Sequence, residues 1–167
     1  MNLSGDTKKA LQEIAGKLGV KYSWLWKLIN FESRWNPQAK NPYSSARGLI
    51  QFIDSTARNL GYKNSLDLVT KHPTITSQLR TPVYNYLKQF KPFPTKQSLY
   101  MAVFYPKARK WHSKAVFPFR VMIANPGIFT VQDYINYVEG KGKNKLFIPL
   151  ILGIGTGVYL LTRKGVL

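Results

Sequence analysis

The chain of 167 residues contains no cysteine, only two histidines and only seven acidic residues. Without cysteine it can form no disulfide and no thiolate metal site, and it has no thiol nucleophile. The two histidines, His72 and His112, lie far apart in the sequence, and carboxylates that could complete a ligand set are scarce. We therefore expect no metal site and no cofactor.

Basic and apolar residues are abundant instead. Lysine and arginine number 25, which gives a formal net charge of +18, and hydrophobic residues make up 44% of the chain. This apolar fraction excludes a disordered polycation, and the length fits one domain with an appendage at most. The charge indicates a polyanionic partner, such as nucleic acid, anionic lipid or a bacterial envelope rich in phosphate and carboxylate. Residues 1–20 lack a continuous apolar stretch, so we predict no N-terminal secretion signal.

The longest apolar run lies near the C-terminus. Residues 146–161 carry no charge and are flanked by basic residues on both sides. Sixteen residues of helix span about 24 Å, somewhat short of the hydrocarbon core of a bilayer. The terminal position and the basic flanks favour a transmembrane helix over the alternative, a buried core helix. We predict a domain at 1–140, a basic linker at 141–145, a transmembrane helix at 146–162 and a short basic tail at 163–167.

The part before this run has the pattern of short helices broken by turn residues. One helix that Asp6 or Thr7 caps should end at Gly19, and the next, capped by Ser23, should end by about Arg34. Alternating strand patterns are nearly absent, although a small hairpin within 36–47 stays open. Further helices are predicted over 48–60, 65–71, 75–90, 96–105, 107–116 and 131–139, with Asn64, Thr95 and Thr130 among the N-caps. The fold class is mainly α.

Glu32 differs from the other six acidic residues, which have ordinary capping or solvent-facing positions. It lies at the end of an aromatic-rich helix. The helix cannot continue far beyond it, because Pro37 disfavours a helical conformation in the residue before it. A carboxyl group among Trp, Phe and Leu side chains is poorly solvated when charged, so its pKa should rise and it could serve as a general acid. The alternative is an exposed glutamate at a helix end.

The residues around Glu32 resemble a known signature. The sequence reads ESRWNPQA at 32–39, followed by SSARGLIQF at 44–52. This block resembles the signature of the lytic transglycosylases of the soluble, goose-lysozyme-like superfamily. The later segments 100–106 and 124–129 are similar to bacteriophage-type members, so the resemblance covers roughly residues 9–139. It implies a lysozyme-like helical domain.

The resemblance also implies a reaction. Family members cleave the β-1,4 bond between N-acetylmuramic acid and N-acetylglucosamine in peptidoglycan and leave a 1,6-anhydro end. A single glutamate, here Glu32, gives a proton to the leaving oxygen and then takes one from the C6 hydroxyl of the sugar. Many hydrolytic glycosidases need two carboxylates. Asp54 is the nearby second carboxylate, and we interpret it as a surface residue that leaves room for a hydrolytic variant.

Six further residues are expected to bind substrate or support the glutamate: Ser33, Asn41, Ser44, Gly48, Gln51 and Tyr105. By the resemblance, Ser33 steadies the glutamate or its helix end, and Asn41 and Ser44 offer polar groups to the sugar. Gly48 lets the backbone run close to the glycan, and the amide of Gln51 bonds an N-acetyl group.

The family's later motif carries a tyrosine whose hydroxyl touches the catalytic glutamate. Here that region departs from the usual form and reads VFYPK at 103–107. We predict that Tyr105 takes the role, with Tyr100, or no tyrosine, as alternatives.

These observations favour a membrane-anchored lytic transglycosylase that acts on peptidoglycan strands. The terminal apolar run and the phage-like segments suggest a virion-associated enzyme used in phage entry, with other virion membrane or capsid proteins as further partners. A chromosomal enzyme of the bacterial envelope is the alternative location. The alternative functions are a hydrolytic muramidase and a non-catalytic membrane structural protein on the same scaffold. Nucleic acid is not expected as a specific partner.

Overall fold

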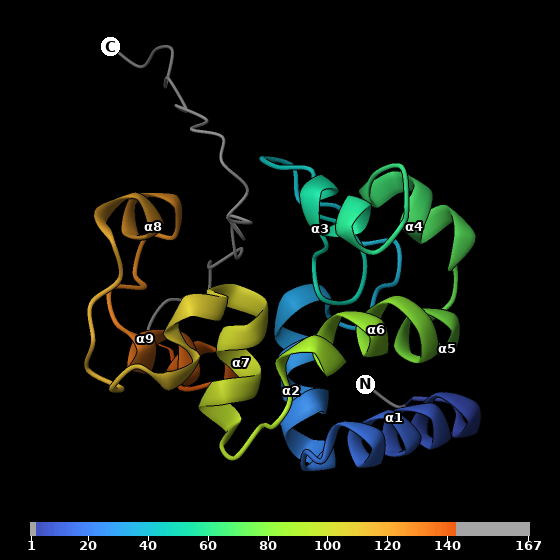
Figure 1. Cartoon of the computed structure of the whole chain (residues 1–167), viewed down its shortest axis with the longest axis horizontal. Helices are drawn as coiled ribbons and strands as arrows, with labels where there is room; N and C mark the ends of the chain where they lie inside the picture. The colour runs from blue at the N-terminus through green and yellow to red at the C-terminus, as the bar shows by residue number, and fades with distance from the viewer. Residues whose placement is uncertain (1–2, 143–167) are drawn as a thin grey trace.

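The computed structural model describes residues 3–142, and these residues are mainly helical with no strand (Figure 1). The α-helices are α1 (Gly5–Leu18), α2 (Tyr22–Ser33), α3 (Asp54–Asn59), α4 (Ser65–Lys71), α5 (Ile75–Gln78), α6 (Tyr84–Leu87), α7 (Lys96–Phe104), α8 (Phe119–Ala124) and α9 (Val131–Val138). Three short elements join them, the π-helix η1 (Leu79–Val83) and the 3₁₀-helices η2 (Lys88–Phe90) and η3 (Pro106–Lys110). The predicted mainly helical fold class is confirmed for this part of the chain.

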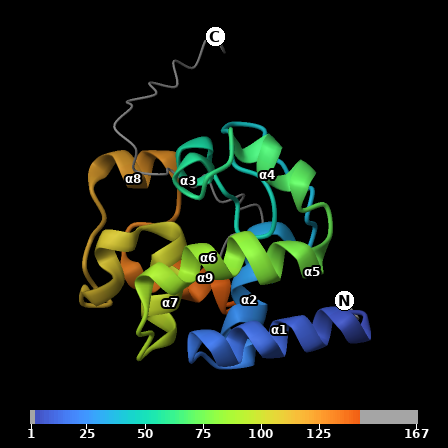
Figure 2. The same ribbon diagram turned by 45° about the vertical axis from the view of Figure 1, so that its right-hand side comes forward.

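Helix α2 is the central element of the fold. It packs against α1 on one side and against α7 and α9 on the other. In Figures 1 and 2, α3 and α4 lie beyond α5 and α6, at the side of the molecule away from α1. Helix α2 therefore contacts helices from both halves of the chain.

The N-terminal helices show how local chemistry sets the boundaries. Gly19 ends α1 in a left-handed conformation, as predicted, and its N–H donates to carbonyls of the last turn. The N-cap of α1 is Ser4 rather than Asp6 or Thr7, because the Ser4 hydroxyl accepts from the backbone of Thr7. Helix α2 begins one residue before the predicted cap Ser23, and its N-cap residue makes no side-chain cap bond.

The predicted helix over 48–60 is wrong in its first half. Residues 48–53 form a tight turn, and α3 starts only at Asp54. Gly48 and Gln51 have φ values of +78° and +54°, which a right-handed helix cannot contain. Isolated antiparallel bridges join Arg47 to Lys40 and to Phe52. The Lys40–Arg47 bridge pairs the two sides of the loop where the sequence left a small hairpin open, although no strand forms there.

Most helices of the later half match their prediction. The segment 75–90 is one continuous helical stretch, in which the wider π-turn of η1 accommodates Pro82, a residue without a backbone donor. The predicted caps Asn64, Thr95 and Thr130 all accept a hydrogen bond from the third helical residue. The predicted helix over 107–116 is wrong, because only η3 forms there, and α8 was not predicted.

The predicted membrane-anchored localisation has to be corrected. Within residues 3–142, no helix combines the length and the apolar character needed to cross a bilayer. The predicted transmembrane helix over 146–162, the tail after it and most of the linker lie outside the described residues. A membrane location is therefore not assigned to this chain.

Candidate active site

Glu32 lies in the last turn of α2, and its side chain is buried with only 6% of the residue exposed. The helix ends there because Arg34 and Trp35 adopt left-handed backbone conformations and turn the chain sharply. One carboxyl oxygen, Oε1, accepts a hydrogen bond from the hydroxyl of Tyr134. The other, Oε2, is buried and has no hydrogen-bond partner among residues 3–142.

These surroundings set the protonation of Glu32. Burial raises the pKa of its carboxyl to about 8, and the hydrogen bond from Tyr134 offsets this rise only in part. No lysine or arginine lies against the carboxyl to favour its charged form, as far as residues 3–142 are concerned. Glu32 is therefore protonated at neutral pH and able to give a proton to a bound group.

Tyr134 comes from α9 and was not predicted as a site residue. Its ring stacks on Phe104, with centroids 4.2 Å apart, and meets the edge of Phe31 at 5.5 Å. Burial, together with the charge of Glu32, raises the pKa of the Tyr134 hydroxyl well above its usual range, so it stays a donor. The sequence did hold a signal, because Tyr134 shares the buried stripe of α9 with Val131 and Val138, and a buried tyrosine hydroxyl needs a partner.

The prediction for Tyr105 needs correction, since the tyrosine bonded to Glu32 is Tyr134. Tyr105 is the residue directly after α7, and its buried ring packs against Trp111 at 5.6 Å and Phe117 at 5.7 Å. The alternative Tyr100 donates its hydroxyl to Glu139, at 2.7 Å. Tyr105 and Tyr100 therefore belong to the core and to an ion-pair cluster, respectively.

A cleft of ≈ 280 Å³ lies on the far side of Phe104 from Tyr134, the partner of the glutamate, and Glu32 itself is not one of the residues that line it. Its lining includes Gln51, Tyr86, Phe104 and Lys107. Phe104 connects the cleft to the acid, because the same ring stacks on Tyr134. Burial, and after it the charge of Glu32, raise the pKa of the Tyr86 hydroxyl, which donates to the carbonyl of Ala102. The cleft is thus linked to the buried carboxyl through the ring of Phe104 and the hydroxyl of Tyr134.

The other predicted residues mostly shape the loop over 34–53. The Ser33 hydroxyl donates back to the carbonyl of Ile29 at 3.2 Å, within its own helix. Asn41 accepts from the backbone of Tyr43 at 2.8 Å, and Ser44 accepts from that of Ala46 at 3.2 Å. These bonds form tight turns in which a side chain replaces a backbone acceptor.

Gly48 and Gln51 hold the part of this loop that reaches the cleft. A Cβ at Gly48 would lie 2.7 Å from Oε1 of Gln78, so only glycine fits. The amide of Gln51 donates to the carbonyl of Gly48 at 2.9 Å, and Gln51 lines the cleft. Gln51 is thus the one of these loop residues that borders the cleft directly.

Gln78 is a structural residue that the sequence did not suggest. It is fully buried, and its carboxamide accepts from the backbone of Leu49 at 2.9 Å and donates to the carbonyl of Pro37 at 2.7 Å. It also donates to the carbonyl of His72 at 2.9 Å. One side chain therefore joins both ends of the loop to the segment before α5.

Asp54, the second carboxylate that the sequence left open, has a structural role in α3. Its Oδ1 accepts from the backbone and the hydroxyl of Ser65, at 2.9 and 2.7 Å, and so ties α3 to α4. Within residues 3–142, no group of three His, Cys, Asp or Glu side chains gathers in the way a metal ion requires.

One comparison with known protein families found a match. The family model described as Transglycosylase SLT domain matches residues 9–87, from α1 to α6. No curated protein matches the chain. The match includes Glu32, the loop over 34–53 and Gln78, and it ends before α7. It supports the soluble lytic transglycosylase superfamily and a transglycosylase-type enzyme that acts on peptidoglycan. The mainly helical structure is consistent with a lysozyme-like fold.

Proposed function

We propose that this chain is a peptidoglycan lytic transglycosylase in which Glu32 is both the general acid and the general base. The observation that carries the proposal is the buried Glu32, which is neutral at physiological pH and is linked to a cleft through Tyr134 and Phe104. Among residues 3–142, which include all seven acidic residues, no other acidic residue is buried. A non-catalytic scaffold has no chemical need for such a group.

The reaction needs only this one carboxyl group. Protonated Glu32 gives its proton to the glycosidic oxygen, and the bond between that oxygen and C1 of the muramic acid breaks. The Glu32 carboxylate then takes the proton of the C6 hydroxyl as O6 forms a bond to C1. The products are a 1,6-anhydro end and a free sugar hydroxyl, no water is consumed, and Glu32 is protonated again.

Tyr134 supports the charged half of this cycle. Between the two proton transfers Glu32 is a carboxylate in apolar surroundings, and such a charge is costly to bury. The Tyr134 hydroxyl donates to that carboxylate, while its stacked ring fixes where the hydroxyl points. In the cleft, Gln51 is the residue proposed to bind an N-acetyl group of the glycan.

A muramidase that uses water is the second candidate. It would need a further carboxylate to activate water or to stabilise the intermediate. Asp54 is the nearest in sequence to the motif, and its Oδ1 already accepts two hydrogen bonds from Ser65. This arrangement favours the single-carboxylate reaction.

Product mass separates the two reactions. Purified sacculi digested with the full chain should release muropeptides lighter by one water than reducing-end products, as measured by mass spectrometry. Reducing ends alone would overturn the transglycosylase reaction in favour of the muramidase. A chain with Glu32→Gln should release neither product.

A role in phage entry is a separate part of the proposal. It rests on the resemblance of residues 100–106 and 124–129 to bacteriophage-type members, which the family match does not reach. The test is detection of the chain in purified phage particles by mass spectrometry. Its absence from particles of a phage that encodes it would overturn this role and leave the enzymatic reaction untouched.

A further inference from the structure

The segment around α8 exposes an unusual amount of apolar side chain. Four large hydrophobic residues in this one short stretch are 55% to 72% exposed, and they are Val116, Phe119, Ile123 and Phe129. We use the term α8 surface for these four residues together with the nearby cations Lys107, Lys110, Lys114 and Arg120.

The fold itself holds these apolar side chains in exposed positions, because the inner side of the same segment is anchored in the core. Phe117, Val121 and Ile128 are buried in the core. The backbone N–H of Phe117 donates to the carbonyl of Phe129 at 2.9 Å, and a bridge pairs Val116 with Thr130. The outer side chains are therefore held outward by a backbone with fixed internal contacts.

Unneutralised cations accompany these apolar residues. No acidic residue occurs between Asp67 and Asp133 in the sequence. Lys107, Lys110, Lys114 and Arg120 are exposed, and none of them forms an ion pair with any residue in 3–142. By contrast, Lys17, Lys27 and Lys71 each pair with a carboxylate. The α8 surface thus offers positive charge to an external anion.

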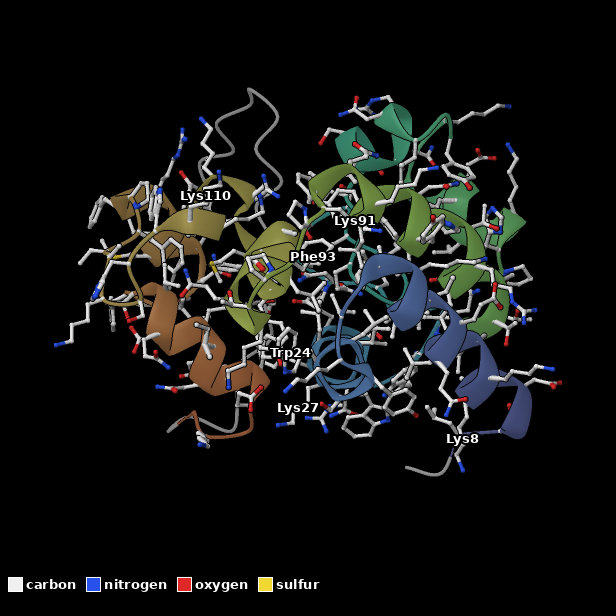
Figure 3. The ribbon with its side chains drawn as sticks, turned by 60° about the horizontal axis from the view of Figure 1, so that its bottom comes forward. Lys8, Trp24, Lys27, Lys91, Phe93 and Lys110 are labelled. Carbon is white, nitrogen blue, oxygen red and sulfur yellow. The ribbon has the colours of Figure 1, made fainter. Side chains whose placement is uncertain are left out.

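The α8 surface begins at the cleft. Pro106 and Lys107 of η3 line the cleft, and the other cations follow within the next thirteen residues. Figures 1 and 2 show α8 in the upper part of the molecule, as they do α3, one of the helices whose residues line the cleft. Figure 3 shows Lys110 far from Lys8, at the opposite end of the molecule. A glycan in the cleft would therefore pass next to this surface.

We propose that the α8 surface binds the peptide stems of peptidoglycan, an inference that rests on the proposed function. Each stem hangs from a muramic acid of the glycan and carries free carboxylates together with alanine methyl groups. The carboxylates match Lys110, Lys114 and Arg120, and the methyl groups match Phe119 and Ile123. The arrangement selects glycan that bears stems over naked glycan, because the stems add contacts beyond those of the sugar.

A binding experiment separates this proposal from catalysis. The full chain with Glu32→Gln is sedimented with sacculi that carry stems and with glycan strands from which an amidase has removed them. We expect binding to stem-bearing material to be about tenfold tighter. Lys110→Gln with Lys114→Gln should weaken that binding about threefold to tenfold, and Phe119→Ser with Ile123→Ser should weaken it similarly. Both pairs of residues are exposed, so neither change should affect folding.

The matched control is Lys9→Gln with Lys21→Gln, which removes the same charge from exposed positions at α1 and the start of α2. Its binding should stay within about twofold of the Glu32→Gln chain. Equal affinity for stripped and stem-bearing glycan would overturn the proposal. An equal loss in the control would also overturn it. The proposal would fail as well if the Glu32→Gln chain bound DNA or anionic vesicles through Lys110 but did not bind stem-bearing sacculi. If stem-dependent binding holds but the unmodified chain cuts no sacculi, the proposed enzymatic function alone fails.

Discussion

Two carboxylates that contact or cap α9 show how surroundings decide what an acidic residue does. Glu32 contacts α9 through Tyr134, whose hydroxyl donates a hydrogen bond to its carboxyl. Glu139, the C-cap of α9, is partly buried, with 11% of its side chain exposed. It lies against Lys27 at 2.8 Å, Lys96 at 3.5 Å and the Tyr100 hydroxyl at 2.7 Å.

The difference in partners gives opposite protonation states. Burial alone would raise the pKa of both groups, but the hydrogen bonds from Lys27 and Tyr100 lower the pKa of Glu139 to about 2. Among residues 3–142, Glu32 has no cationic partner, and its pKa rises to about 8. Glu139 is therefore a permanent charge that holds α2, α7 and α9 together, whereas Glu32 keeps a proton that chemistry can use.

Replacing Glu32 should have the largest effect. Glu32→Gln keeps the shape of the side chain but cannot cycle a proton, so the rate of sacculus cleavage should fall about 10²-fold to 10⁴-fold. Turbidity clearing of sacculi measures the rate, and circular dichroism checks that the fold is intact. Clearing that persists in a folded variant would show that another residue is the acid.

Removing the donor to Glu32 should have the next largest effect. In Tyr134→Phe the carboxylate loses its hydrogen bond, and cleavage should slow about tenfold to 100-fold. Because this bond lowers the pKa of Glu32, the alkaline limb of the pH–rate profile should move to higher pH. Tyr105→Phe is the matched control, expected to change the rate less than about twofold and to leave the limb in place. An unmoved limb in Tyr134→Phe would contradict the role given to this hydroxyl.

The pH dependence of stability should sharpen the contrast between the two carboxylates. The folded-state pKa of Glu32 is raised from 4.5 to about 8, so the folded chain binds more protons than the unfolded chain between these values. The free energy of unfolding should therefore fall as pH rises from 4.5 to 8, by up to about 1.4 kcal/mol per pH unit. Urea unfolding at several pH values measures this slope. Glu32→Gln should remove it, and an unchanged slope in that variant would assign it to other groups.

Glu139→Gln should have the smallest effect on catalysis. It removes the charge that pairs with Lys27 and Lys96, and we expect a loss of about 1–2 kcal/mol of stability at pH 7, since the cluster is partly exposed. In the unmodified chain this contribution is present above pH 4.5 and is lost as pH falls towards 2, because the folded-state pKa is lowered. Urea unfolding at pH 7 and pH 3 checks both statements. A greater loss at pH 3 than at pH 7 would contradict them.

The sequence predicted what depends on neighbours along the chain. The caps Asn64, Thr95 and Thr130 were predicted because a capping side chain bonds the backbone three residues later. The burial of Glu32 followed from the apolar residues of its own helix. The prediction of a helix over 48–60 was wrong in its first half because Gln51 has a left-handed backbone conformation. Glutamine has no evident preference for turns, so this conformation is set by the loop around it.

What the sequence did not predict depends on distant contacts. Tyr134 lies 102 residues from Glu32 in the chain, and only the packing of α9 against α2 brings them together. Gln78 likewise acts on Leu49, 29 residues away. The position of Tyr134 on the apolar stripe of α9 indicates that it is buried, but the partner of its hydroxyl, like the partners of Gln78, is revealed only by the folded arrangement.

The protonation of Glu32 can be measured directly. Carbon-13 NMR of the full chain, labelled at the glutamate side-chain carboxyls, would follow the Glu32 signal through a pH titration, with Glu32→Gln assigning the resonance. We expect this carboxyl to titrate near pH 8. A midpoint near 4.5 would mean that Glu32 is charged at neutral pH, and it would contradict the role of Glu32 as the proton donor.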